Sequence, residues 1–297
     1  MPKVYMPSIL KAVLSLALLL GLLSGCATFG RWGYETLPTW MMWRVQSYLD
    51  LEGEPKALAR RHLDALHQWH QSTQLKPLLA SVRQVRSQVE AGRYNAGMLK
   101  ETREALAEDL EPLLDQAAPK IAEVALRLEG SQLARMRREF DKDNDKLRRE
   151  RLQGSATERA EARAKRYIER AEFFLGDLNA AQRQLIRERS SRWPPVEQQW
   201  YEQRLARQQE LLALLERLRT ERPALPVASR LMREHLNRYL QWREGAEREG
   251  TVNSMAAGDA LLIELLGGIT PRQKQHLLER LDDWISTLEK LASQRPA

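Results

Sequence analysis

The chain has 297 residues, of which 43% are hydrophobic and 29% charged, a balance typical of a folded protein rather than a disordered one. Its single cysteine excludes an intramolecular disulfide, and its formal net charge is +7. Leu, Ala, Arg, Glu and Gln dominate, β-branched runs are absent, and no long stretch alternates apolar with polar residues. We therefore expect an all-α protein.

The first 25 residues have the three parts of a secretory signal peptide. Lys3 and Lys11 supply positive charge, residues 12–23 are apolar, and Ser24 and Gly25 are small. The apolar block is shorter than the roughly 20 residues that a membrane-spanning helix needs. The pattern therefore predicts a cleaved leader over residues 1–25.

The run L-S-G-C, which ends at Cys26, resembles the lipobox of bacterial lipoproteins. This resemblance implies that a signal peptidase cuts before Cys26 and that the cysteine sulfur carries a diacylglycerol, an anchor strong enough for stable attachment. We expect a lipidated tether over 26–33 and an all-helical periplasmic domain over 34–297, with a candidate subdivision near residue 154. Ala27 follows the cysteine, which by resemblance to enterobacterial sorting implies an outer-membrane anchor that faces the periplasm.

Export changes how the positive charge is interpreted. Cleavage removes Lys3 and Lys11, which lowers the formal charge from +7 to +5. A cytoplasmic protein with this balance would suggest nucleic acid, whereas the anions of a periplasm are lipid headgroups, lipopolysaccharide and acidic polypeptides. We expect a protein or anionic envelope partner and no nucleic acid. The alternative is that Arg and Glu simply cover solvated helix faces.

An aromatic segment from Trp32 to Tyr48 follows the tether, and Pro38 can open a helix within it. The segment either docks in the membrane interface, where Trp and Tyr are favoured, or packs as the first core helix. Apolar spacing then predicts helices over 53–72 and from Pro77 to about residue 91.

Turn and proline signals divide the next part of the chain. A turn at 93–97 precedes a helix predicted over 98–115, and Pro119 is expected to open another that ends near residue 130. Two long charged helices follow over 131–151 and 155–175, each with one thin apolar stripe. In the second, Ser155 and Glu158 have the spacing of a capping box.

The first charged helix carries a group of arginines that we expect to face solvent and to bind an anionic partner. They are Arg135, Arg137, Arg138, Arg148 and Arg149. After these helices, the pattern predicts helices over 196–220, 227–244 and 271–292. The segment T-V-N-S, residues 251–254, is interpreted as a loop.

One helix-start pattern recurs along the chain: an apolar residue, a cap-like or small residue, and Gln four positions after the apolar one. It begins at Leu128, Leu178 and Ile269, with a weaker copy at Leu51. The apolar residue would pack back on the first helical turn while the cap satisfies free backbone amides.

The later residues of these helices also correspond. Trp193 and Trp284 follow Leu178 and Ile269 at equal distances, so we expect both tryptophans in the core. The recurrence favours duplicated helical hairpins, although any helix start selects such residues. The expected fold is an elongated multi-helix bundle of repeated helical hairpins with two long charged helices.

These motifs carry two resemblances. The L-x-x-x-Q pattern, closest to complete in I-T-P-R-Q, is similar to the LTxxQ motif of Spy-like periplasmic chaperones and stress-sensor accessory proteins. More widely, the lipobox, Y-L-D-L from Tyr48, W-H-Q-S-T-Q-L-K-P from Trp69 and the later L-x-x-x-Q helices resemble an uncharacterised family of helix-rich Gram-negative lipoproteins. This second resemblance implies location and fold.

Residues with catalytic or metal-binding patterns are sparse. Asp64, His67 and His70 share one face of a predicted helix and could ligate a metal, but histidines on so polar a helix usually face solvent. We expect no catalytic site, no metal and no cofactor. The leading hypothesis is a non-catalytic binding or scaffolding lipoprotein. The alternatives are a periplasmic holdase-type chaperone or envelope-stress accessory protein and, less favoured, an envelope hydrolase.

Overall fold

The computed structural model describes residues 32–108, 110–194, 196–240 and 247–294. Helices make up 87% of the structure, and 12 of them pack against one another with no strand in the described residues, which confirms the all-α prediction. In chain order they are α3 (Leu37–Leu49), α4 (Gly53–Thr73), α5 (Leu75–Glu90), α6 (Ala96–Glu108), α7 (Leu110–Ala125), α8 (Gly130–Arg151), α9 (Ala156–Leu175), α10 (Ala180–Ser191), α11 (Glu197–Glu221), α12 (Leu225–Leu240), α13 (Glu247–Gly267) and α14 (Pro271–Ser293).

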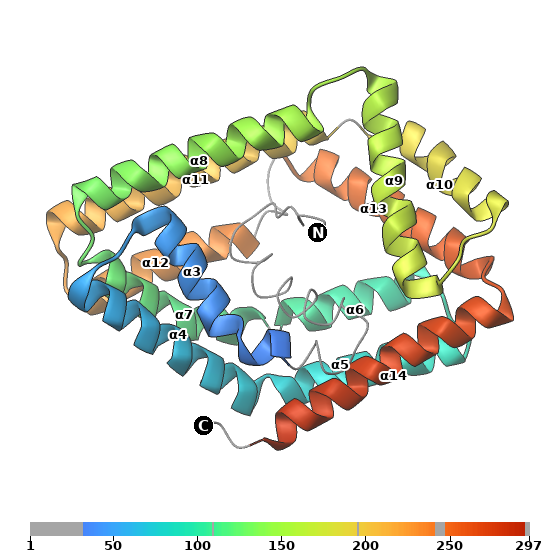
Figure 1. Cartoon of the computed structure of the whole chain (residues 1–297), viewed down its shortest axis with the longest axis horizontal. Helices are drawn as coiled ribbons and strands as arrows, with labels where there is room; N and C mark the ends of the chain where they lie inside the picture. The colour runs from blue at the N-terminus through green and yellow to red at the C-terminus, as the bar shows by residue number, and fades with distance from the viewer. Residues whose placement is uncertain (1–31, 109, 195, 241–246, 295–297) are drawn as a thin grey trace.

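The helices follow a flattened, closed outline (Figure 1). α8 and α11 run side by side along one long edge, and α5 and α14 run side by side along the opposite edge. α9 packs against α10 at one end, while α7 packs against α12 and α4 at the other. The last helix therefore lies beside one of the first.

Two large apolar clusters hold this arrangement together. The first joins α3, α4, α7, α8, α11 and α12, and Leu51, Ala122 and Leu218 are fully enclosed in it. The second joins α5, α9, α10, α13 and α14, with Ile186 and Trp193 among its buried members. The two long charged helices divide between them, since α8 lies in the first cluster and α9 in the second.

The helix starts follow the cap chemistry that the sequence predicts. Ser155, Asn179 and Thr270 each accept a hydrogen bond from the backbone N–H three residues later. At all three sites the side chain at that later position accepts in return from the backbone N–H of the cap residue, which completes a capping box. The expected starts of α9, α10 and α14 are confirmed.

Two segments differ from the prediction. Pro119 lies inside α7 rather than at a helix start, and the helix expected over 98–115 is shared between α6 and α7. The segment 251–254, expected as a loop, lies inside α13. Trp193 is buried as predicted, whereas Trp284 is half-buried at the edge of the second cluster.

The aromatic segment after Trp32 divides its side chains between two faces. Leu37, Met42 and Tyr48 are buried, and α3 packs against α4 and α8. Trp40 and Trp43 are 59% and 62% exposed. The segment is therefore a core helix on one face, as one alternative predicted, and leaves large aromatic side chains at the surface on the other.

Among the described residues, no single helix is both long and apolar enough to cross a membrane. One bent pair, Val252–Gly267 with Pro271–Ser293, passes the same test of length and composition, with an angle of 118° between its two helices.

Candidate functional site

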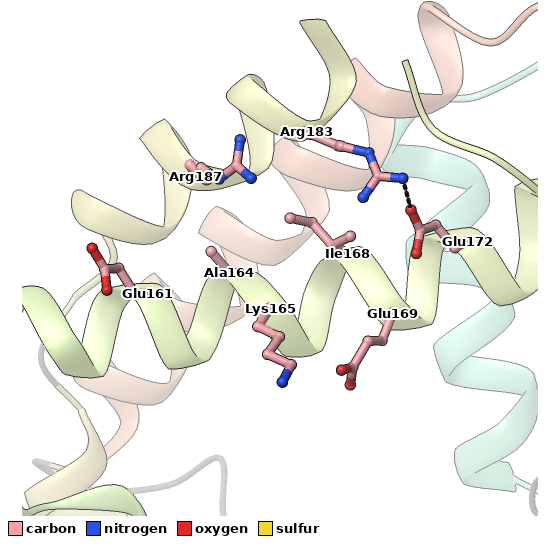
Figure 2. Close-up of a pocket in the computed structure, with 8 residues that line it drawn as sticks. All are labelled: Glu161, Ala164, Lys165, Ile168, Glu169, Glu172, Arg183 and Arg187. Atoms are coloured by element: carbon pink, nitrogen blue, oxygen red, sulfur yellow. Dashed lines mark ion pairs between the residues drawn. The ribbon is translucent and has the colours of Figure 1, made fainter. Parts of the chain in front are cut away.

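A shallow hollow of about 510 Å³ lies along the hairpin of α9 and α10 (Figure 2). The two helices pair through small and branched apolar residues, and Ala164 and Ile168 lie between them. The turn between the helices uses Gly176 with a φ of 72°, a conformation that favours glycine. The hollow is thus an open surface feature with an apolar floor.

Charged side chains of both signs surround this floor. Glu161, Lys165, Glu169 and Glu172 come from α9, and Arg183 and Arg187 come from α10. The Arg183 NH2 lies 2.5 Å from Glu172 Oε1, whereas Arg187 has no carboxylate within ion-pair distance in the described part of the chain. Three acidic and three basic groups balance one another, so the hollow has shape but no overall preference for anions or cations.

The α8 arginines that were predicted to bind a partner differ in their surroundings. Arg135 is half-buried, and its NH1 lies 3.0 Å from Asp50 Oδ2. Arg137 and Arg148 are about three turns apart and share one side of the helix, as do Arg138 and Arg149. All four are exposed. The structure therefore separates Arg135, which is paired across to another segment, from two outward-facing pairs.

Most of the outward-facing α8 arginines make no ion pair within the described residues, although Arg137 is near enough to Glu216 on α11 to help lower the pKa of that carboxyl. Arg148 lies 3.7 Å from Asp145, but no carboxylate lies within ion-pair distance of Arg137, Arg138 or Arg149 among the residues that the structure describes. The helix as a whole carries eight basic and five acidic side chains. We name Arg137, on one side of the helix, and Arg138 and Arg149, on the adjacent side, the α8 arginine face.

The positive potential extends from the end of α8 to α9. Burial, and then the nearby charges of Arg151 and Arg163, lower the pKa of Arg166 to about 10. Arg163 is itself neutralised, since it pairs with Glu197 and its NH1 donates to the Ser190 carbonyl at 2.7 Å. The charge of Glu197 also acts on Arg166 and raises its pKa, but by less than burial and the two arginines lower it. An anionic group near this corner would relieve the repulsion among the cations.

The histidines considered as metal ligands are instead packed against an aromatic ring. His67 Nε2 lies 3.1 Å from the Tyr34 carbonyl, and Tyr34 Oη lies 3.0 Å from His70 Nδ1. Asp64 is paired with Arg60 at 3.3 Å. Both histidines are half-buried rather than solvent-facing. In the described residues, no group of three or more His, Cys, Asp and Glu side chains is placed to hold a metal ion.

The environment of His70 predicts a pH dependence of stability. Burial and the neighbouring His67 lower the pKa of His70 to about 4, below the value near 6.5 of an exposed histidine. The unfolded chain therefore binds this proton first, so the free energy of unfolding should fall as the pH drops from about 6.5 towards 4. Replacing His70→Gln should flatten this part of the stability curve, measured by urea unfolding at several pH values. An unchanged slope would contradict this assignment.

The L-x-x-x-Q helix starts of α10 and α14 meet in space. Gln182 Nε2 donates to Gln273 Oε1, and Gln273 Nε2 donates to Gln182 Oε1, both at 2.9 Å. Each amide also reaches across to the turn before the other helix, Gln182 to the Gly268 carbonyl and Gln273 to that of Asp177. Both side chains are buried. These glutamines therefore bind two related helix starts to each other and present no surface to a partner.

A further polar group lies between α3, α8 and α11. Tyr48 and Arg44 both bind the carboxylate of Asp143, with the Arg44 NH2 at 3.1 Å, and Arg204 Nε donates to the side chain of Asn144 at 2.7 Å. Burial raises the pKa of Tyr48 and lowers that of Arg204. Sequence reasoning missed this group. Its one signal is Asn144, a polar residue on the apolar stripe of α8.

Cys26, the predicted lipid-attachment residue, lies outside the described residues.

The comparison with known proteins identifies the family. A family of unknown function, DUF6279, matches residues 47–243, about two thirds of the chain. The match includes α8 and its arginines, whereas Trp32, Trp40, Trp43, α13 and α14 lie outside it. No curated protein and no solved structure matches. The chain is therefore a member of the DUF6279 family of unknown function.

Proposed function

We propose that this protein is a lipid-anchored, non-catalytic binding or scaffolding protein of the outer membrane, and that it faces the periplasm. The observation that carries the binding role is the α8 arginine face, three exposed arginines that have no carboxylate partner within the described residues. The nearby charges of Arg151 and Arg163 support it, because they add to burial in lowering the pKa of Arg166 at the adjoining corner. Such a surface accelerates the encounter with an anionic partner.

The α9–α10 hollow suits the same role. Its floor of Ala164 and Ile168 is 3% and 8% exposed and offers a small apolar contact, and its balanced rim offers charges of both signs. Charged side chains give specificity and speed of encounter, whereas desolvated apolar contacts supply most of the affinity. A partner that is anionic where it meets α8 and mixed in charge where it meets the hollow would use both surfaces.

The anchor is supported by the run L-S-G-C and predicts the behaviour of one substitution. Cys26→Ala should abolish lipidation and leave an uncleaved or mislocalised precursor, because the thiol that would carry the diacylglycerol is gone. Metabolic labelling with palmitate and fractionation of the envelope measure this. Absence of label in the wild-type protein, or unchanged fractionation of the variant, would refute the anchor.

Neutralising the α8 arginine face tests the binding role. A photo-reactive residue placed at Lys142 on α8 should give a discrete adduct in cells, and the triple change Arg137→Gln, Arg138→Gln and Arg149→Gln should weaken that adduct strongly. Stability should change little, by about 0.5 kcal/mol or less per site, since all three side chains are exposed. The salt dependence of the remaining binding should become shallower.

A matched variant controls for net charge. Arg230→Gln, Arg272→Gln and Lys290→Gln remove the same number of exposed positive charges from α12 and α14. This control should leave the adduct unchanged. Equal weakening by both triple variants would mean that overall charge, rather than α8, attracts the partner.

A further inference from the structure

The exposed tryptophans near the start of the described chain form a continuous stripe. Trp32, Trp40 and Trp43 are all exposed, and the half-buried Thr36 lies between Trp32 and Trp40 at helical spacing. The Trp40 and Trp43 rings meet edge to face with centroids 6.1 Å apart. We name Trp32, Trp40 and Trp43 the tryptophan stripe.

The other side of α3 holds this stripe in place. Leu37, Met42 and Leu49 are buried on that side, and α3 packs against α4 and α8. Trp40 and Trp43 therefore project from a helix that is fixed to the body, so their orientation relative to the whole protein is set. Exposed side chains of this size are uncommon on soluble surfaces, and a cluster of them marks an interaction site.

The position of the stripe in the chain indicates what covers it. Only six positions separate Cys26 from Trp32, and a segment of that length spans at most about 20 Å. If the sulfur of Cys26 is acylated, the stripe is held within that distance of a bilayer. Trp is favoured at the membrane–water interface because its ring is largely apolar while its N–H remains hydrogen-bonded.

We propose that the tryptophan stripe docks in the interfacial layer of the phospholipid bilayer that carries the anchor. Trp40 and Trp43 lie along α3 and Trp32 lies shortly before its start, so the stripe would lie along the membrane surface, as interfacial helices do. The contact would fix the orientation of the body, including α8, relative to the membrane. This proposal rests on the lipid anchor of the proposed function and adds a second point of attachment to it.

Fluorescence quenching by brominated lipid tests the docking. The full chain, purified with its native processing, is reconstituted into phosphatidylethanolamine–phosphatidylglycerol vesicles with and without brominated acyl chains. We expect the brominated lipid to quench part of the tryptophan emission of the wild-type protein. The double change Trp40→Ser and Trp43→Ser should remove about half of that quenching or more, because these rings would lie at the acyl boundary.

The matched control is Trp200→Ser, which removes a tryptophan that is 45% exposed on α11. It should leave the quenched emission unchanged. Circular dichroism melting of each variant verifies that it is folded. Anchored wild-type protein without quenching, or a double variant quenched like wild type, would overturn the proposal and leave a protein partner as the occupant of the stripe.

Mass spectrometry of the N-terminal peptide separates this proposal from the anchor. A diacylglyceryl mass on Cys26 without quenching refutes the docking and keeps the anchor. Without that mass the anchor fails, and quenching of the unlipidated protein added to the vesicles then still decides the docking. Loss of this quenching in the double variant would support it, and absence of quenching would overturn it.

Discussion

Replacing Trp193→Ala should lower the free energy of unfolding by about 3–5 kcal/mol, the usual cost of removing a buried aromatic side chain. Trp193 is 8% exposed, and its ring lies 5.2 Å from that of Tyr167 between centroids. Its Nε1 donates to Ser254 Oγ at 2.9 Å, and Gly258 leaves room for the ring on α13. The substitution would leave a cavity and an unpaired Ser254 hydroxyl between α10 and α13.

Urea unfolding followed by circular dichroism measures this loss. Trp200→Ala, at the exposed start of α11, is the control and should cost little. Trp284→Ala should fall between the two, because Trp284 is only half-buried where it meets Phe174. A destabilised Trp200 variant beside an unaffected Trp193 variant would mean that the inside and outside of this region are reversed.

Replacing Gln182→Glu should destabilise the protein by at least about 3 kcal/mol at neutral pH, because it buries a charge opposite two acceptors. The amide nitrogen that is lost donates to Gln273 Oε1 at 2.9 Å and to the Gly268 carbonyl at 3.2 Å. A carboxylate oxygen in its place would face both oxygens without a proton between them. The same change would remove two of the hydrogen bonds that join the starts of α10 and α14.

The pH dependence of the Gln182→Glu variant shows whether its loss of stability comes from the buried charge or from a change in packing. Burial and the facing oxygens should raise the pKa of the new carboxyl in the folded protein. The penalty is then largest above that raised pKa and diminishes below it, so the deficit relative to wild type should shrink from pH 7 to pH 4. Gln184→Glu, an exposed neighbour on α10, should cost about 0.5 kcal/mol or less at either pH. Equal deficits in both variants would refute the buried amide pair.

Helix starts were predictable from the sequence because their chemistry is local. A cap residue and a glutamine or glutamate three positions later lie within one turn, so the starts of α9, α10 and α14 needed no knowledge of tertiary contacts. What the sequence did not reveal is that Gln182 and Gln273 bind each other. That contact depends on how two distant helices pack.

The two wrong boundaries have a tertiary cause. Proline inside a helix removes one backbone hydrogen bond and costs about 3 kcal/mol, which is why Pro119 was expected at a helix start. In α7, the alanines around it are fully enclosed against α12, where Ala228 and Met232 are also buried. Likewise, Ser254 is a residue type typical of loops, but in the structure it lies on α13 and accepts a hydrogen bond from the Trp193 Nε1–H. In both segments, the residues that pack against the helix stabilise it despite a local sequence that favours a break.

The α8 arginines show the same limit of prediction from sequence at the candidate site. Their exposure on α8 could be predicted from the thin apolar stripe of that helix, and four of the five are exposed. The pairing of Arg135 with Asp50 could not be predicted, because Asp50 lies at the end of α3, a separate helix. The countercharges of a side chain depend on which segments the fold brings beside it.

The way in which α14 closes the outline has a consequence for how the chain folds. Arg83 on α5 pairs with Glu289 on α14, and 206 positions separate them. The apolar face of α5 therefore stays uncovered until the chain is complete through α14 and that helix has packed against it. During that interval, α14 of a second copy could occupy the same face with the same contacts. A domain-swapped dimer joined through exchanged C-terminal helices is the misassembly that this topology favours.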